Sequence, residues 1–239
     1  MARSADLLDR LAEDPARAAL FLDVDGVLAP IVPRPADARV PDETRAELRR
    51  LNGRYGLVAC VSGRAGEDAR RIVGVPELTY VGNHGLELEP AAADWTAALR
   101  RLLAEVDWPH TEDKGLTAAL HYRDMADEAA ARAELEAVAA RARAAGFVAR
   151  FGRKVLDLVP PVDTDKGKAV RTLLERSKLD RALAAGDDTT DLDAFHALDG
   201  LALAVRVAVS SDEGPAQLRE EADLVVADPQ EFLGVLRRL

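Results

Sequence analysis

Two aspartates that follow a short apolar segment are the first residues with the means to do chemistry. Residues 19–24 are apolar apart from Asp23, and Asp25 and Gly26 come next. Because a glycine lets the chain turn sharply, both carboxylates can approach one reacting centre. Neighbouring carboxylates divide into an ionised nucleophile and a proton donor when their surroundings push their pKa values apart. The alternative is that Asp23 and Asp25 only cap a loop, as acidic residues commonly do.

A second acidic group follows another apolar segment. Gly186 ends that segment, and Asp187, Asp188 and Asp191 come directly after it. Such a concentration of negative charge is costly unless a hard cation lies among the carboxylates. Oxygen ligands favour magnesium or calcium over zinc. An acidic cap on the helix predicted from Asp191 is the alternative, but two acids suffice for a cap, so the third favours a metal site.

Two weaker signals lie at predicted helix starts. Ser62-Gly63-Arg64 stands between a predicted strand and a predicted helix, where a hydroxyl and backbone N–H groups suit a phosphate. An ordinary helix cap has the same pattern. Lys166 opens the helix predicted over 166–177, where its charge opposes the helix dipole, and that local conflict is a hint of function. For the nearby Lys168, a solvated surface position is the simpler interpretation.

The elements that must position these residues are strands alternating with helices, which predicts an α/β fold. Short apolar segments predict strands at 19–24, 57–62, 78–82, 181–186, 201–207 and 223–226. Segments of helical period predict helices at 42–52, 66–73, 166–177, 191–197 and 215–220. This alternation predicts a parallel sheet covered on both faces. Ligands bind beyond the carboxyl ends of such strands, and the polar motifs stand at those ends.

The middle of the chain breaks this rhythm and predicts an inserted domain over 89–162. We expect helices at 94–106 and 126–145, and strands at 110–113, 116–122, 147–151 and 155–159. The helix–hairpin unit, occurring twice, forms an α+β layer of order αββαββ. Residues 1–88 and 163–239 are then the two halves of the core domain.

Composition limits the classes of partner. The chain has 239 residues, is 48% hydrophobic and 31% charged, and carries a formal net charge of -10. That charge argues against nucleic acid or an anionic membrane as the main partner. A single cysteine, Cys60, allows no internal disulfide, and neither a signal peptide nor a membrane span is evident, so we expect a cytoplasmic protein. The sequence sets no oligomeric state, and a monomer fits it.

In this order, the four motifs resemble those of the haloacid dehalogenase superfamily: Asp-x-Asp, Ser/Thr, Lys and a terminal acidic cluster. The resemblance implies a Rossmann-like core and a phosphoaspartyl mechanism, in which Asp23 attacks phosphorus. Asp25 would protonate the leaving oxygen and then activate the hydrolytic water. The phosphoryl oxygens would be held by Ser62, the Gly63 amide and Lys166. The implied cofactor is Mg²⁺, with ligands from Asp23, the Asp25 carbonyl, Asp187 and, at or just behind the ion, Asp191.

A narrower resemblance, to trehalose-6-phosphate phosphatases, covers nearly the whole chain. The matching stretches include residues 22–31, 61–64, 81–87 and 186–195. Most specific are 112–116 and 120–123, because they lie in the insertion. In that family the insertion is a cap whose Glu-x-Lys-Gly turn closes over the sugar hydroxyls. The resemblance implies a sugar phosphate substrate contacted by His84, Glu112, Lys114, Arg123 and Asp157.

Three alternatives stay open at this point. Asp157 stands where the family usually has Glu, so another disaccharide or pseudo-disaccharide phosphate is a possible substrate. From a different class, a receiver-type signalling module also combines an acidic cluster, a phosphorylatable Asp and a Lys. A receiver is about half this length and has no insertion. A dinucleotide-binding enzyme is disfavoured, because no Gly-x-Gly-x-x-Gly follows the first strand.

Overall fold

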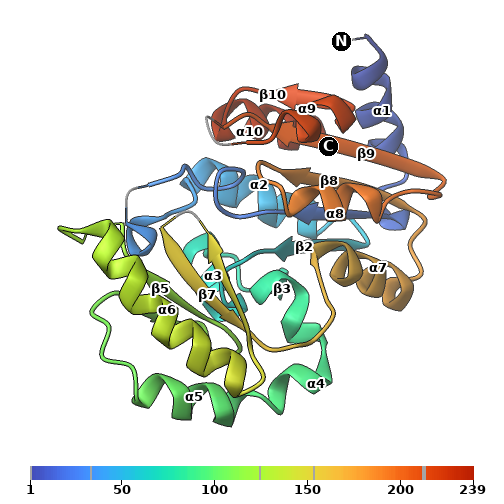
Figure 1. Ribbon diagram of the computed structural model, residues 1–239. Helices are drawn as coiled ribbons and strands as arrows, with labels where there is room; N and C mark the ends of the chain where they lie inside the picture. Colours follow the sequence, from blue (N-terminus) through green and yellow to red (C-terminus); the bar gives the residue numbers. More distant parts are fainter. Residues whose placement is uncertain (1, 33, 124, 153, 212–213) are drawn as a thin grey trace. The chain divides into compact units, whose positions relative to one another are not determined.

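The computed structural model describes residues 2–32, 34–123, 125–152, 154–211 and 214–239. It contains two compact units (Figure 1). The core unit comprises Met1–Gly85 with Thr164–Leu239, and the inserted unit comprises Leu86–Asp163. No helix in the described part of the chain combines the length and the apolar character needed to cross a bilayer.

The core unit is built on a parallel sheet of order β10-β9-β8-β1-β2-β3. Its strands are β1 (Ala18–Leu22), β2 (Leu57–Val61), β3 (Thr79–Val81), β8 (Arg181–Gly186), β9 (Leu203–Val209) and β10 (Leu224–Val226). All five residues of β1 are buried, because this strand pairs with β2 on one side and β8 on the other. A strand with neighbours on both sides and helices on both faces has no solvated side chain, which explains its unbroken apolar sequence.

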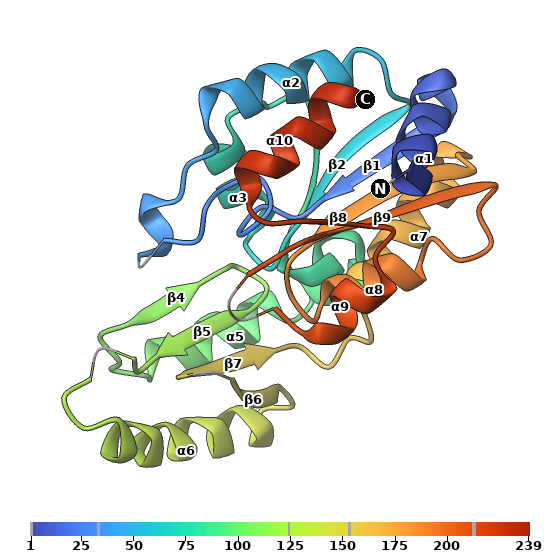
Figure 2. The ribbon, with the colours of Figure 1, turned by 90° about the horizontal axis from the view of Figure 1, so that it is seen from above.

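Helices cover both faces of this sheet, as Figure 2 shows. On one face lie α1 (Ala2–Glu13), α2 (Asp42–Asn52), α3 (Gly66–Val73) and α10 (Pro229–Arg238), which share one apolar cluster with the sheet. The other face is covered by α7 (Lys166–Ser177), α8 (Asp191–His196) and α9 (Ala216–Glu221). The sequence did not predict α1 or α10. Both are held by leucine and phenylalanine side chains that pack into the cluster, including Leu8, Leu11 and Phe232.

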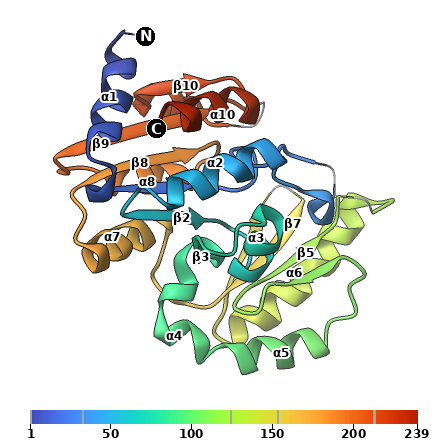
Figure 3. The same cartoon turned by 180° about the vertical axis from the view of Figure 1, so that it is seen from behind.

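The inserted unit has an antiparallel sheet of order β4-β5-β7-β6. Its elements are α4 (Pro90–Ala93), α5 (Thr96–Ala104), β4 (Thr111–Asp113), β5 (Ala118–His121), α6 (Glu128–Ala144), β6 (Val148–Gly152) and β7 (Val155–Val159). Figure 3 shows α6 lying along β5 and β7. Alternate residues of the strands, such as Leu120 and Leu156, pack with α5 and α6 in a second apolar cluster. The other residues of each strand occupy the opposite, polar face. A parallel sheet with a separate antiparallel sheet confirms the predicted fold class.

Candidate active site

The polar motifs meet at one edge of the core sheet. Asp23 follows β1, Ser62 follows β2, and Asp187 follows β8. These strands are neighbours in the order β8-β1-β2, and all are parallel, so their carboxyl ends lie side by side. The local backbone joins them further, because the Asp23 N–H donates to the Ala185 carbonyl at 3.0 Å. The fold therefore brings together side chains that are far apart in the sequence.

Lys166 is at the centre of a buried ion network. Its Nζ donates to Asp23 Oδ1 at 2.9 Å and to Asp191 Oδ1 at 2.7 Å. The three side chains are only 2%, 8% and 3% exposed, respectively. Burying three charges costs free energy of desolvation, which well-placed hydrogen bonds must offset. A lysine in the first turn of α7, where the helix dipole disfavours it, is thus stabilised by two carboxylates.

Asp191 uses its second oxygen to organise the turn between β8 and α8. Asp191 Oδ2 accepts from the backbone N–H of Asp187 at 2.9 Å and of Asp188 at 3.1 Å. Asp188 in turn accepts from the N–H and the hydroxyl of Thr190, both at 2.7 Å. With one oxygen on Lys166 and the other on the backbone, Asp191 has a fixed position.

The charges of this network fit a divalent cation. One oxygen from each of Asp23, Asp187 and Asp191 lies within 4.8 Å of the others. Burial and the nearby Asp191 carboxylate raise the pKa of Asp187 to about 7. Burial likewise raises the pKa of Asp23 and of Asp191, although Lys166 opposes the effect in both. Lys166 compensates only one of the three negative charges, so a bound cation would let all three carboxylates stay ionised.

Two glycines leave the space in which these carboxylates sit. Gly26 has a φ of 77°, and a Cβ added there would lie 2.3 Å from Asp187 Oδ2. A Cβ added at Gly186 would lie 2.1 Å from the Asp191 Cβ. Both distances are far below van der Waals contact. The donors are oxygen atoms only, which suits Mg²⁺ or Ca²⁺ and not zinc.

The predicted phosphate turn is tightly held. Ser62 is buried, and its N–H donates to the Val81 carbonyl at 3.0 Å. Asn83 and His84 have positive φ values of 52° and 54°. Residues other than glycine rarely adopt this backbone conformation, and where they do, they are often found at functional sites. This conformation brings the His84 ring so close to Gly63 that a Cβ there would lie 2.6 Å from it. The structure thus places His84 beside the Ser62–Gly63 turn.

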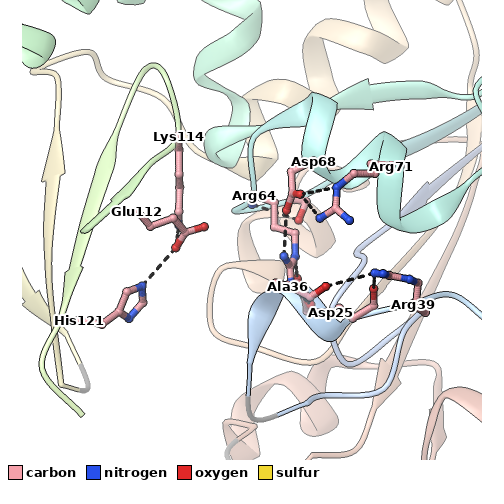
Figure 4. A network of polar contacts seen from close by, with 11 residues as sticks. Asp25, Ala36, Arg39, Arg64, Asp68, Arg71, Glu112, Lys114 and His121 are labelled. Carbon is pink, nitrogen blue, oxygen red and sulfur yellow. Dashed lines mark hydrogen bonds and ion pairs between the residues drawn. The ribbon is translucent and has the colours of Figure 1, made fainter. Parts of the chain in front are cut away.

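The structure also shows a contact that the sequence did not predict. Arg64, next to the phosphate turn, donates from Nε to Asp25 Oδ2 at 2.6 Å and from Nη2 to Asp25 Oδ1 at 2.7 Å (Figure 4). Its Nη1 donates to Asp68 at 2.9 Å, and Asp68 also accepts from Arg71. Arg64 precedes the first residue of α3 and lies 39 positions from Asp25, so no local spacing in the sequence predicts their contact.

In the inserted unit, the polar face of the sheet carries most of the predicted sugar residues. Glu112 and Asp157 both pair with Ala119, so they share a face with it. Glu112 Oε2 lies 3.2 Å from His121 Nε2 and 3.9 Å from Lys114 Nζ (Figure 4). Burial raises the pKa of Asp157, while Lys114 and His121 oppose that shift. His121 had no predicted role, and only the strand register shows that it belongs here.

Arg123, the remaining predicted sugar residue, is exposed in the turn after β5. Among the residues that the structure describes, Arg123 makes no hydrogen bond with Glu112, Lys114 or Asp157. The structure thus groups Glu112, Lys114 and Asp157, and leaves Arg123 outside the group.

The chain is similar to known proteins over most of its length. The trehalose-phosphatase family model matches residues 21–230. A trehalose-phosphate phosphatase of Mycobacterium ulcerans is 35% identical over 229 residues, which cover 84% of this chain and 57% of that protein. The chain therefore spans little more than half the length of that curated relative.

Solved structures show the same fold. A trehalose-6-phosphate phosphatase related protein superposes with a TM-score of 0.73 at 24% identity, over 92% of this chain and 95% of that one. A haloacid dehalogenase-like hydrolase from Bacteroides thetaiotaomicron gives a TM-score of 0.61 at 15% identity, over 92% and 98%. A receiver module would share neither the family match nor the inserted unit. The family match over almost the whole chain, on a fold of this kind, shows that the protein belongs to the trehalose-phosphatase family.

Proposed function

We propose that this chain hydrolyses trehalose 6-phosphate to trehalose and phosphate through a phosphoaspartyl intermediate on Asp23. Family membership supports the substrate, and so does the name of the Mycobacterium ulcerans relative. The observation that carries the chemistry is the buried contact of Lys166 with Asp23 and Asp191, beside Asp187. A nucleophile held next to an ammonium group is what displacement at a phosphate dianion requires.

The proposed reaction has two steps on the same face of the site. In the first, an Asp23 oxygen bonds to phosphorus while the bond to the sugar oxygen breaks, and Asp25 gives its proton to that oxygen. In the second, Asp25 takes a proton from a water molecule, which attacks phosphorus and releases Asp23. Ser62, the Gly63 amide and Lys166 would hold the phosphoryl oxygens through both steps.

We propose Mg²⁺ as the resident cation, with ligands from Asp23, the Asp25 carbonyl, Asp187 and Asp191. The three buried carboxylates and the raised pKa of each support a divalent ion, and the phosphate chemistry favours Mg²⁺ over Ca²⁺. When bound, the ion would neutralise part of the charge that nucleophile and phosphoryl group bring together.

Sugar recognition is proposed for the inserted unit, as a cap spanning residues 89–162. The polar face with Glu112, Lys114 and Asp157 offers donors and acceptors of the kind that sugar hydroxyls need. Arg123 and, from the core unit, His84 are proposed to add further contacts. The partner is then a small sugar phosphate and neither nucleic acid nor a membrane, and we retain the cytoplasm as the proposed compartment.

A second candidate substrate is favoured by Asp157. Its side chain is one methylene shorter than the Glu usual in the family, so it reaches about 1–1.5 Å less far. A charge-assisted hydrogen bond does not survive that gap without a compensating shift or a bridging water. Another phosphorylated disaccharide or pseudo-disaccharide is therefore the alternative.

A phosphate-release panel decides between these substrates. We would compare trehalose 6-phosphate with other sugar phosphates and disaccharide phosphates in the presence of Mg²⁺, with the Asp23→Asn variant as the blank. Trehalose 6-phosphate should have the highest kcat/KM. A tenfold preference for another sugar phosphate would replace the substrate but keep the chemistry. Release no faster than the blank from every ester would remove the proposed activity altogether.

A further inference from the structure

We infer that Arg64 is the positioning residue for Asp25, and that it acts on the reaction only through that carboxylate. This inference rests on the proposed function, in which Asp25 moves the proton. It adds a residue to which neither the motifs nor the resemblance gave a role, and it assigns that residue a task other than binding phosphate.

The contact has the geometry that fixes an orientation. Two nitrogens of Arg64 reach the two oxygens of Asp25, at 2.6 and 2.7 Å. A planar guanidinium that meets a carboxylate in this forked way sets the plane of the carboxylate as well as its distance. Each carboxylate oxygen has two lone pairs, so the fork leaves one on each oxygen for a proton. Arg64 therefore decides in which direction Asp25 exchanges its proton.

Arg64 is itself anchored, so the orientation is not left to a mobile side chain. Its side chain is 11% exposed, whereas that of Asp25 is 39% exposed. The third nitrogen of Arg64 donates to Asp68, which is held in turn by Arg71. A half-exposed carboxylate at the end of β1 would otherwise sample several rotamers, and each misplacement would slow proton transfer.

The backbone of Arg64 is hydrogen-bonded to the predicted phosphate turn and to the segment after β3. Its N–H donates to Ser62 Oγ at 3.3 Å, and its carbonyl accepts from the Asn83 N–H at 2.7 Å. Three of the five N–H donors of the guanidinium are directed at Asp25 and Asp68. Direct phosphate binding by Arg64 is the competing interpretation, and the two differ in what they predict for kcat and KM.

The first test varies the leaving group. A proton donor matters most when the leaving alkoxide is strongly basic, and least for the weakly basic p-nitrophenolate. Arg64→Gln should lower kcat for a simple alkyl phosphate by about 10²-fold, at the low end of general acid effects, and kcat for p-nitrophenyl phosphate by less than about tenfold. A phosphate-binding role would instead raise KM for both esters and weaken inhibition by inorganic phosphate.

The second test is a double-mutant cycle with Asp25→Asn. If Arg64 acts only through Asp25, the double variant Asp25→Asn/Arg64→Gln should be no slower on the alkyl phosphate than Asp25→Asn alone, to within about twofold. Arg64→Lys keeps the positive charge but cannot make the two-nitrogen contact, so it should be as slow on the alkyl phosphate as Arg64→Gln. If Arg64→Gln fails to fold, Arg64→Lys takes its place in the cycle. Arg70→Gln is the matched control: it removes an arginine of α3 that pairs with Glu67 and not with Asp68, and it should stay within about twofold of wild type.

Each outcome separates the two hypotheses. Losses that multiply in the double variant, or full activity in Arg64→Lys, would overturn the positioning role while wild-type turnover kept the proposed function intact. A different preferred sugar would not affect either test, because both esters lack a sugar. Failure of the wild-type protein to release phosphate from any ester, trehalose 6-phosphate included, would overturn the proposed function and this inference with it.

Discussion

The core unit and the inserted unit both gather charged side chains, but they hold them in different ways. In the core, Lys166, Asp23 and Asp191 are almost fully buried and joined at 2.7–2.9 Å. In the inserted unit, the His121 and Glu112 side chains are 41% and 35% exposed. Glu112 Oε2 lies 3.2 Å from His121 Nε2 and 3.9 Å from Lys114 Nζ. Water screens the second group, so its ion pairs contribute little to stability, whereas breaking the first is costly.

This difference fits the two tasks proposed above for the units. Displacement at phosphorus needs charges that are already in place when the reaction begins, and burial provides that. Recognition of a sugar needs donors and acceptors that are free to exchange water for hydroxyl groups, and exposure provides that. Substitutions of the buried charges Lys166, Asp23 and Asp191 should therefore impair every substrate alike, while substitutions on the polar face of the inserted unit should impair only the disaccharide phosphate.

The largest effect is expected from Asp23→Asn. A neutral amide cannot attack phosphorus, so turnover of every ester should fall below detection. The fold should survive because Lys166 keeps its hydrogen bond to Asp191, which avoids the large cost of leaving a buried charge without a partner. The free energy of unfolding should fall by about 1 kcal/mol and the melting temperature by a few degrees. Phosphate release and thermal unfolding measure the two quantities, with the exposed Asp37→Asn as control. A tenth of wild-type activity remaining would disprove the covalent mechanism.

Removal of the metal should have the next largest effect. EDTA should stop turnover of all substrates, and Mg²⁺ should restore it. Because an ion that binds only the folded state stabilises it, Mg²⁺ at about 100 times its Kd should add about 2.7 kcal/mol to the free energy of unfolding. Thermal unfolding with and without Mg²⁺ gives this second readout.

Asp187→Asn should lose most of the Mg²⁺-dependent stabilisation, while the exposed Asp199→Asn should keep it. Ca²⁺ should stabilise the fold yet support little turnover, since its looser coordination misplaces the nucleophile. Full activity in metal-free buffer would contradict the assignment of the buried acids.

A smaller and more selective effect is expected from Lys114→Ala. Turnover of trehalose 6-phosphate should fall by about tenfold or more, the value of one lost charge-assisted hydrogen bond, while p-nitrophenyl phosphate should be hydrolysed at nearly the wild-type rate. Lys154→Ala is the matched control, because that lysine also belongs to the inserted unit but pairs with Glu128. Equal losses on both substrates would show that Lys114 does not read the sugar.

The smallest effect is expected from Asp157→Glu. The longer side chain restores the usual family residue on a strand whose other contacts are unchanged, so kcat/KM for trehalose 6-phosphate should change by less than about threefold, or under 1 kcal/mol. The sugar phosphate panel, repeated on this variant, measures the change. A switch of the preferred sugar on this one substitution would instead identify Asp157 as the residue that sets specificity.

Apolar segments made the core strands predictable to within a few residues, since a strand buried on both faces has an unbroken apolar sequence. Periodicity missed α1 and α10. Among residues 6–13 of α1, whose burial is described, only Leu8 and Leu11 are buried, so this part of the sequence looks polar. The sequence of α10 does carry a helix-start signal, an aspartate (Asp228) directly before a proline. In the structure Asp228 caps the helix by accepting from the Glu231 N–H at 2.8 Å.

The site was predictable where residue type and order suffice, and not where contacts depend on register. That Asp23, Ser62 and Asp187 follow parallel strands placed them at one sheet edge. The contact between Arg64 and Asp25 spans 39 positions, and no local pattern specifies which carboxylate a long side chain will reach. His121 joined the polar face only because β5 pairs with β4 and β7 in this register.

Gly26 and Gly186 bear on how mutational scans of this protein should be interpreted. Alanine scanning measures importance by deleting a side chain, but at these two positions it inserts a methyl group where a carboxylate already lies. Alanine at either position would displace Asp187 or Asp191 and mimic the loss of an acid that is still present. Such a result could be misinterpreted as evidence that the glycine, which has no functional group, takes part in the chemistry. What these positions supply is empty volume, and a scan reports its loss in the same units as the loss of a ligand.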